Sequence, residues 1–131
     1  MVVKMSRTKR GLKKSHSEKA AALKQTRFTV IVNKQDGKCW YCGEKMGADC
    51  TREHLLSQSA GGTNTYPVNN LKASHSDCNI AAGHLPIKQK YRLRVIAHTK
   101  GREEMFRIAL QMRRENTRIA FSVQKDEILN Y

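Results

Sequence analysis

Residues 39–79 read CWYCGEKMGADCTREHLLSQSAGGTNTYPVNNLKASHSDCN, and this stretch begins and ends with a short cysteine motif. The first motif is CxxC, formed by Cys39 and Cys42, and the second is HxxC, formed by His75 and Cys78. Each spacing lets two side chains of one tight turn reach a single ion with tetrahedral geometry. We therefore expect these four residues to hold one structural Zn²⁺, whose four ligands leave no open position for a substrate.

Two other interpretations of the cysteines have less support. A redox function of the CxxC motif would leave the HxxC motif without a role. The remaining cysteine, Cys50, is expected to be a buried free thiol on a strand. A ligand role for Cys50 is the alternative, but four ligands are already present without it.

The segment between the motifs predicts a β-hairpin. Short apolar segments at residues 54–56 and 70–73 flank SAGGTNTYPVN, whose Gly, Asn and Pro residues indicate a long loop between two strands. The stretch NIAAGHL, from Asn79, predicts a short helix whose length Gly83 and Pro86 limit. The fold class expected is α+β, a small ββα core stabilised by zinc and flanked by basic helices.

Helices are expected on both sides of this core. The stretch EKAAALKQ gives helical composition to about residues 17–33, and FTVIV after it fits either the end of that helix, which we favour, or a strand. YRLRVIAH and EEMFRIALQMRRENTRIAF predict two more helices. The second has Met105, Ile108, Ala109 and Met112 on one face, a stripe typical of core packing.

Charge is distributed unevenly along the 131 residues, which include 25 Lys and Arg against 11 Asp and Glu, a net charge of +14. Residues 1–27 have a net charge of +8, residues 28–84 of zero, and residues 85–131 of +6. We expect a basic arm that is partly disordered or helical, a central core, and a basic helical extension, with these boundaries. Basic flanks indicate a polyanion such as nucleic acid, the alternative being a soluble basic surface. A membrane is not expected, because the flanks lack a stripe of Trp or Phe.

Candidate catalytic residues lie between the two cysteine motifs and just after the second. Glu53 and His54 follow the first motif, Asn70 precedes the second, and Asn79 follows it. In the order CWYC, EH, SAGG, NNL and HSDCN, the sequence resembles the HNH endonuclease family, in the zinc-knuckle, HNN-type form found in small phage, homing and restriction nucleases. The resemblance implies a ββα-metal fold over residues 28–84, with His54 on the first strand, Asn70 opening the second and Asn79 starting the helix.

The same resemblance implies which residues act and on what. His54, Asn70 and Asn79 would be catalytic, His54 as the general base and Asn70 by fixing the His54 ring. Glu53 and Asn79 would bind one Mg²⁺ or Mn²⁺. Imidazole titrates near neutral pH and suits deprotonation of water, and hard oxygen ligands suit these cations. The substrate would be DNA, bound through the basic flanks and cut at phosphodiester bonds. Each chain would have one active centre, and two chains could pair as a homodimer.

Other functions remain as alternatives. Glu53 stands where the family most often has Asp, and Asn79 where it most often has His. These departures favour a catalytically inactive, zinc-stabilised nucleic-acid-binding module. A basic assembly protein with a zinc knuckle and a thiol oxidoreductase are two further alternatives.

The sequence also carries an expectation about location. No apolar run approaches the roughly 20 residues that span a bilayer, and the opening residues contain no hydrophobic region of signal-peptide length. We therefore expect an intracellular, cytoplasmic protein, which for a phage-encoded chain means the host cytoplasm. Cysteines in that compartment are more often metal ligands than disulfide partners.

Overall fold

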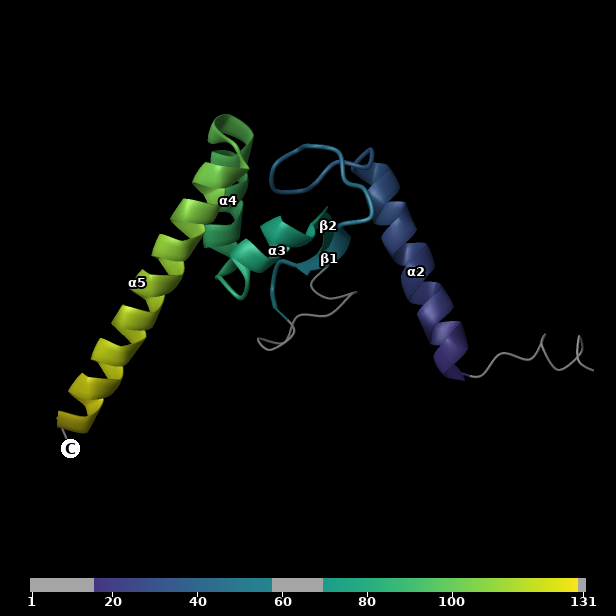
Figure 1. The fold of residues 1–131 in the computed structure, drawn as a ribbon. Coiled ribbons are helices and arrows are strands. Elements are labelled where there is room, and N and C mark those ends of the chain that lie inside the picture. The colour runs from purple at the N-terminus through teal and green to yellow at the C-terminus, as the bar shows by residue number, and fades with distance from the viewer. Residues whose placement is uncertain (1–15, 58–69, 130–131) are drawn as a thin grey trace, which may run out of the picture.

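The computed structural model describes residues 16–57 and 70–129, with helices on both sides of a small β-hairpin. Its elements are α2 (His16–Lys34), β1 (Cys50–His54), β2 (Leu71–His75), α3 (Ser76–Ala82), α4 (Ile87–Lys100) and α5 (Arg102–Leu129). The hairpin and α3 lie in the middle, α2 on one side, and α4 and α5 together on the other (Figure 1). The predicted α+β class, with a hairpin followed by a helix, is confirmed.

The two strands pair antiparallel along their whole length. Cys50 is opposite His75 at one end of the hairpin, and His54 is opposite Leu71 at the other. The loop predicted at SAGGTNTYPVN falls within residues 58–69, outside the described residues. Because Cys50 and His75 are paired, the segment that leads from the CxxC motif into β1 lies beside the start of α3.

Helix α3 starts earlier than the sequence indicated. It begins at Ser76, directly after the extended residue His75, and ends at Gly83, which has a positive φ of 51° and donates its N–H to the Asn79 carbonyl at 2.8 Å. The prediction that Asn79 opens this helix was wrong, because the HxxC turn itself forms the first helical turn. Asn79 therefore projects from the middle of α3.

Helix α2 confirms the predicted N-terminal helix and includes the FTVIV run, so that run is helical. Several contacts attach the helix to the hairpin, among them a hydrogen bond from Arg52 Nη2 to Gln25 Oε1 at 3.1 Å. Phe28 is buried, with the Arg52 guanidinium 4.6 Å from its ring centroid. Just after the helix, the Gln35 amide donates to the Ala73 carbonyl at 2.9 Å and accepts from the Ala73 N–H at 3.0 Å. α2 extends across residue 27, where the sequence suggested a boundary.

Helices α4 and α5 fold against each other, and α5 packs on α3. Gly101, with a φ of 93°, makes the tight connection between them. The residues of the two helices that are buried in the shared core are Leu93, Ala97, Met105, Ala109 and Met112. The predicted stripe on the second helix is thus confirmed as packing, with Ile108 partly buried beside it.

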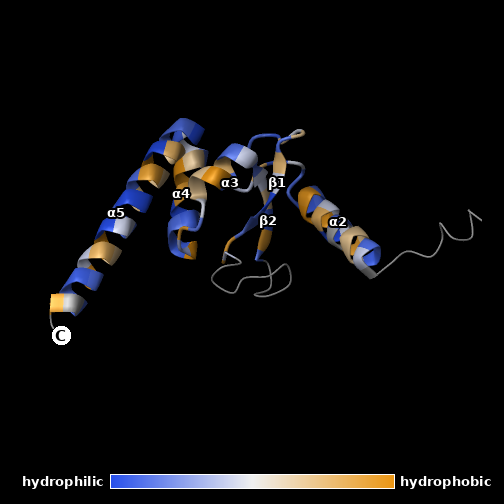
Figure 2. Ribbon diagram, turned by 60° about the horizontal axis from the view of Figure 1, so that its bottom comes forward, coloured by the Kyte–Doolittle hydropathy of each residue, from blue (hydrophilic) through white to orange (hydrophobic). Residues whose placement is uncertain are grey.

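The far half of α5 leaves the core. Hydrophobic residues recur between hydrophilic ones along α5 (Figure 2), but Ile119, Phe121 and Val123 are exposed. Among the described helices, none is long and apolar enough to cross a membrane.

Candidate metal centre and active site

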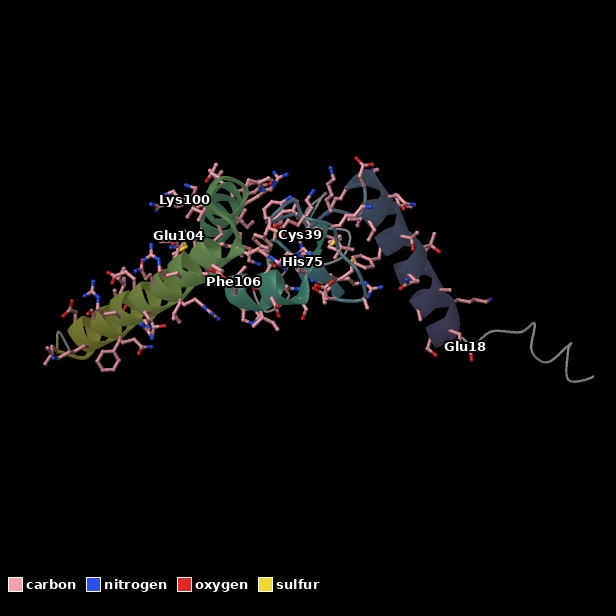
Figure 3. The ribbon with its side chains drawn as sticks, turned by 45° about the horizontal axis from the view of Figure 1, so that its top comes forward. Glu18, Cys39, His75, Lys100, Glu104 and Phe106 are labelled. Atoms are coloured by element: carbon pink, nitrogen blue, oxygen red, sulfur yellow. The ribbon has the colours of Figure 1, made fainter. Side chains whose placement is uncertain are left out.

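The two cysteine motifs meet at the Cys50–His75 end of the hairpin. Ligand atoms of Cys39, Cys42, His75 and Cys78 all lie within 4.8 Å of one another, and the residues are buried or nearly so. Figure 3 shows Cys39 and His75 side by side with sulfur atoms next to them. The sequence prediction that these four residues gather into one group is confirmed.

Backbone hydrogen bonds shape the first motif around this group. The Cys39 N–H donates to the Glu44 carbonyl at 2.8 Å, and the Gly43 N–H donates to the Cys39 carbonyl at 2.9 Å. Gly43 has a φ of 74°, which closes the turn, and an added Cβ there would lie 2.9 Å from His98 Nε2. The turn therefore needs glycine both for its conformation and for space.

The imidazole of His75 is oriented for a metal. Its Nε2 lies 2.9 Å from the Lys45 carbonyl oxygen, and its Nδ1 lies 3.3 Å from Cys42 Sγ. A proton on Nε2 donates to that carbonyl, which leaves Nδ1 as the lone-pair atom that faces the sulfurs. Outer hydrogen bonds of this kind are typical of histidines that bind metals.

The three thiols of this group shift one another's pKa values. A hydrogen bond from Cys78 lowers the pKa of Cys39 to about 4, against the effect of burial. Burial raises the pKa of Cys42, and the hydrogen bond to Cys39 raises that of Cys78. One thiolate is thus stabilised at the expense of its neighbours. Three sulfur ligands and one imidazole nitrogen in a closed set fit Zn²⁺.

Cys50 stands apart from the metal group. It is the first residue of β1, a free thiol and half-buried, whereas the sequence analysis expected it to be buried. Burial raises its pKa. The group of residues that could hold a metal does not include it, in agreement with the free-thiol interpretation.

The other end of the hairpin carries the candidate catalytic residues. Successive side chains of a strand point to opposite faces, so Glu53 and His54 of β1 point in opposite directions. His54 is half-buried and is the last residue of the strand. Its carbonyl oxygen accepts a hydrogen bond from Lys90 Nζ at 2.6 Å, which ties the end of β1 to α4.

Glu53 points into the core, where only 2% of its surface is exposed. Its Oε1 accepts from Lys90 Nζ at 3.0 Å, and its Oε2 accepts from the Tyr41 hydroxyl at 2.9 Å. Burial raises the pKa of Glu53, and the charge of Lys90 opposes that shift. Burial, followed by the charge of Glu53, raises the pKa of Tyr41. This buried trio joins the first motif, β1 and α4.

Asn70 and Asn79 both hold the β1 chain. Asn70 is buried, and its side chain accepts from the Leu56 N–H at 2.6 Å and donates to the Leu56 carbonyl at 3.1 Å. Asn79 Nδ2 donates to the Arg52 carbonyl at 2.8 Å and to Thr51 Oγ1 at 3.2 Å. Both N–H groups of Asn79 are used in these bonds, so its Oδ1 is the atom left for a ligand.

The structure thus attaches the two asparagines to the chain on either side of His54, Asn79 at Thr51 and Arg52 and Asn70 at Leu56. It does not join Glu53 to Asn79 by a hydrogen bond within the described part of the chain. Sequence reasoning missed Lys90. The signal for it was weak but present: Lys90 occupies a position of α4 whose helical neighbours Leu93 and Ala97 are buried.

The comparison with protein-family models matches residues 39–85 to HNH endonuclease. These are the residues that fold as the first motif, the hairpin and α3. We refer to the matched residues 39–85 as the HNH domain. Comparisons with curated proteins and with solved structures found no match. The HNH domain indicates a nuclease-type function, and it ends before Lys90, so the lysine that contacts Glu53 and His54 comes from outside it.

Proposed function

We propose that the protein is a metal-dependent HNH endonuclease that hydrolyses phosphodiester bonds of DNA. The observation that carries the proposal is the match of an endonuclease family to the residues that fold as a hairpin and helix closed by a Cys3His group. The net charge of +14 supports a polyanionic substrate, and the basic flanks would supply much of the affinity.

In this proposal His54 is the general base. It would take a proton from the attacking water, a task that suits an imidazole. Two neighbours hold the chain around it. Lys90 bonds to the His54 carbonyl, and Asn70 clamps Leu56 two residues further on. Asn70 thereby acts as a positioning residue, because it limits how far the His54 ring can move.

Asn79 and Glu53 are the residues that would hold Mg²⁺ or Mn²⁺. Such an ion, when bound, stabilises the charge that develops on the phosphate and on the leaving oxygen. Asn79 offers a hard oxygen on an amide that β1 already orients. A carboxylate has about four acceptor positions, and Glu53 uses two of them for Lys90 and Tyr41. The nearby ammonium opposes a second cation, so Asn79 is the better placed of the two.

The experiment is nicking of supercoiled plasmid by the full-length protein, with Mg²⁺ or Mn²⁺ added or omitted. We expect nicking that needs the divalent ion and that falls by at least about a hundredfold in His54→Ala, as expected when a general base is lost. His84→Ala is the matched control, since His84 is exposed in the turn after α3. Zinc content and circular dichroism of each variant show that the metal centre and fold persist.

The results separate the proposal from its alternative. If wild type and His54→Ala are equally inert but both shift DNA in a gel, the protein is a zinc-stabilised nucleic-acid-binding module. The observation that favours this alternative is that Lys90 and Tyr41 already occupy both oxygens of Glu53. Appearance of linear plasmid without a nicked intermediate would indicate a homodimer.

A further inference from the structure

A polar groove lies against the first cysteine motif, and Cys39 and Cys42 are among its lining residues. This open groove of about 470 Å³ runs between the end of α2, the CxxC turn and α4. Four of its lining residues are basic or histidine: Lys34, Lys38, Arg94 and His98. None of the described residues that line the groove is acidic. The groove therefore has a positive lining that comes from three separate segments.

Arg94 is held in place for binding. Its Nε donates to the Trp40 carbonyl at 2.8 Å, and its guanidinium carbon lies 4.8 Å from the Trp40 ring centroid. Trp40 is in turn fixed by edge contacts with Tyr41 and Tyr91. A planar guanidinium has five N–H donors, so the bond to Trp40 leaves its outer nitrogens for an anion. Little side-chain entropy would be lost when Arg94 binds one.

A further lysine extends this positive region along β2. Burial lowers the pKa of Lys72, and the charges of Arg94 and then Lys34 add to that shift. Lys72 precedes Ala73, whose carbonyl accepts from the Trp40 N–H at 2.9 Å and from the Gln35 amide at 2.9 Å, so this part of β2 adjoins two residues that line the groove. Among the described residues, no ion pair involves the basic side chains of this region, which are Lys34, Lys38, Lys72, Arg94 and His98.

The zero net charge of residues 28–84 conceals this arrangement. Three of their five basic residues, Lys34, Lys38 and Lys72, belong to the positive region. None of their five acidic residues lines the groove, and two of them pair with cations outside it, Glu44 with Arg102 and Glu53 with Lys90. The groove is therefore basic although residues 28–84 as a whole are neutral.

We propose that the groove binds the phosphate backbone of nucleic acid through Lys34, Lys38 and Arg94, with Lys72 extending the contact. Cations from several segments suit consecutive phosphates of a polyanion better than one small anion. The choice of nucleic acid as the partner rests on the proposed function, but binding in the groove does not require that the protein cleaves DNA.

The test is binding of fluorescein-labelled duplex DNA, followed by fluorescence anisotropy over a series of salt concentrations without added divalent metal. Each phosphate contact contributes about 0.9 to the slope of log affinity against log salt. We expect Lys38→Gln to reduce the slope by about 0.9 and Lys34→Gln/Lys38→Gln by about 1.8. Lys45→Gln is the matched control, because Lys45 pairs with Lys38 across a β-bridge but does not line the groove.

Each outcome has a definite meaning. A lower slope in the groove variants, with the slope of Lys45→Gln unchanged, supports the groove. An unchanged slope in the double variant, or an equal loss in Lys45→Gln, overturns it. Wild type that binds vesicles with anionic lipid but not DNA also overturns it. If the groove binds DNA but the protein does not cut plasmid, the nuclease proposal is contradicted and the groove proposal is supported.

Discussion

The two ends of the hairpin are held by different chemistry. At the Cys50–His75 end, four ligand atoms crowd within 4.8 Å and come entirely from the HNH domain. At the His54–Leu71 end, a buried ion pair and two hydrogen bonds of the Asn70 amide hold the chain in place. One partner of that ion pair, Lys90, lies outside the domain. The first end, called the zinc end after the ion that it could hold, is thus local in its design, whereas the second, called the catalytic end after its proposed role, depends on α4.

The largest effect is expected at the zinc end. Cys39→Ser or Cys78→Ser removes one ligand from a centre whose binding energy, about 10–16 kcal/mol in small zinc domains, is also folding energy. We expect each variant to lose its zinc and the cooperative unfolding of the core, measured by metal analysis and by circular dichroism during heating.

Cys50→Ser is the control for these variants, because it removes a free thiol from the same end of the hairpin without touching the metal group. It should keep both the zinc and the unfolding transition. Native zinc content in a Cys39→Ser/Cys78→Ser double variant would contradict the structural role of the site.

An intermediate effect is expected from Lys90→Met. The substitution leaves Glu53 buried without its counter-charge, and breaking a buried pair in this way costs about 3–5 kcal/mol of unfolding free energy. Urea denaturation measures the loss. Because the same ammonium bonds to the His54 carbonyl, nicking should also fall, with the zinc content unchanged.

Two further variants test whether the pair itself is responsible. In Lys90→Met/Glu53→Gln the unpaired charge is gone, so we expect the double variant to be more stable than Lys90→Met alone. Glu44→Gln breaks an exposed pair with Arg102 and should cost at most about 1 kcal/mol. Strict additivity of the Lys90 and Glu53 losses would mean that the two side chains do not stabilise each other.

The zinc end could be predicted almost completely from the sequence. Ligand spacing in CxxC and HxxC is a local property, and so is the alternation of turn and strand between the motifs. The start of α3 was the exception. Composition placed it at Asn79, where the apolar run begins, but His75 at the end of β2 already directs the chain into the first helical turn.

The catalytic end was less accessible to sequence reasoning, for physical reasons. Lys90 counts as flank charge in the sequence, and only tertiary packing makes it the buried partner of Glu53. The positive groove was hidden in the same way, because a sum over residues 28–84 cannot show that Lys34 and Lys38 line one groove that has no acidic lining residue. Charge that is neutral along the chain need not be neutral in space.

The smallest effect, and the most informative about position, is expected from Asn70→Ala. The change leaves the N–H and carbonyl of Leu56 without their partner, at a cost of about 1–3 kcal/mol. Asn116→Ala is the matched control, because it breaks another amide pair, with Gln89, between α4 and α5. If Asn70 positions His54, nicking should fall in kcat with little change in KM, whereas the control should lose some stability and keep its rate. Equal rates in the two variants would reduce Asn70 to a residue that stabilises the catalytic end without orienting its histidine.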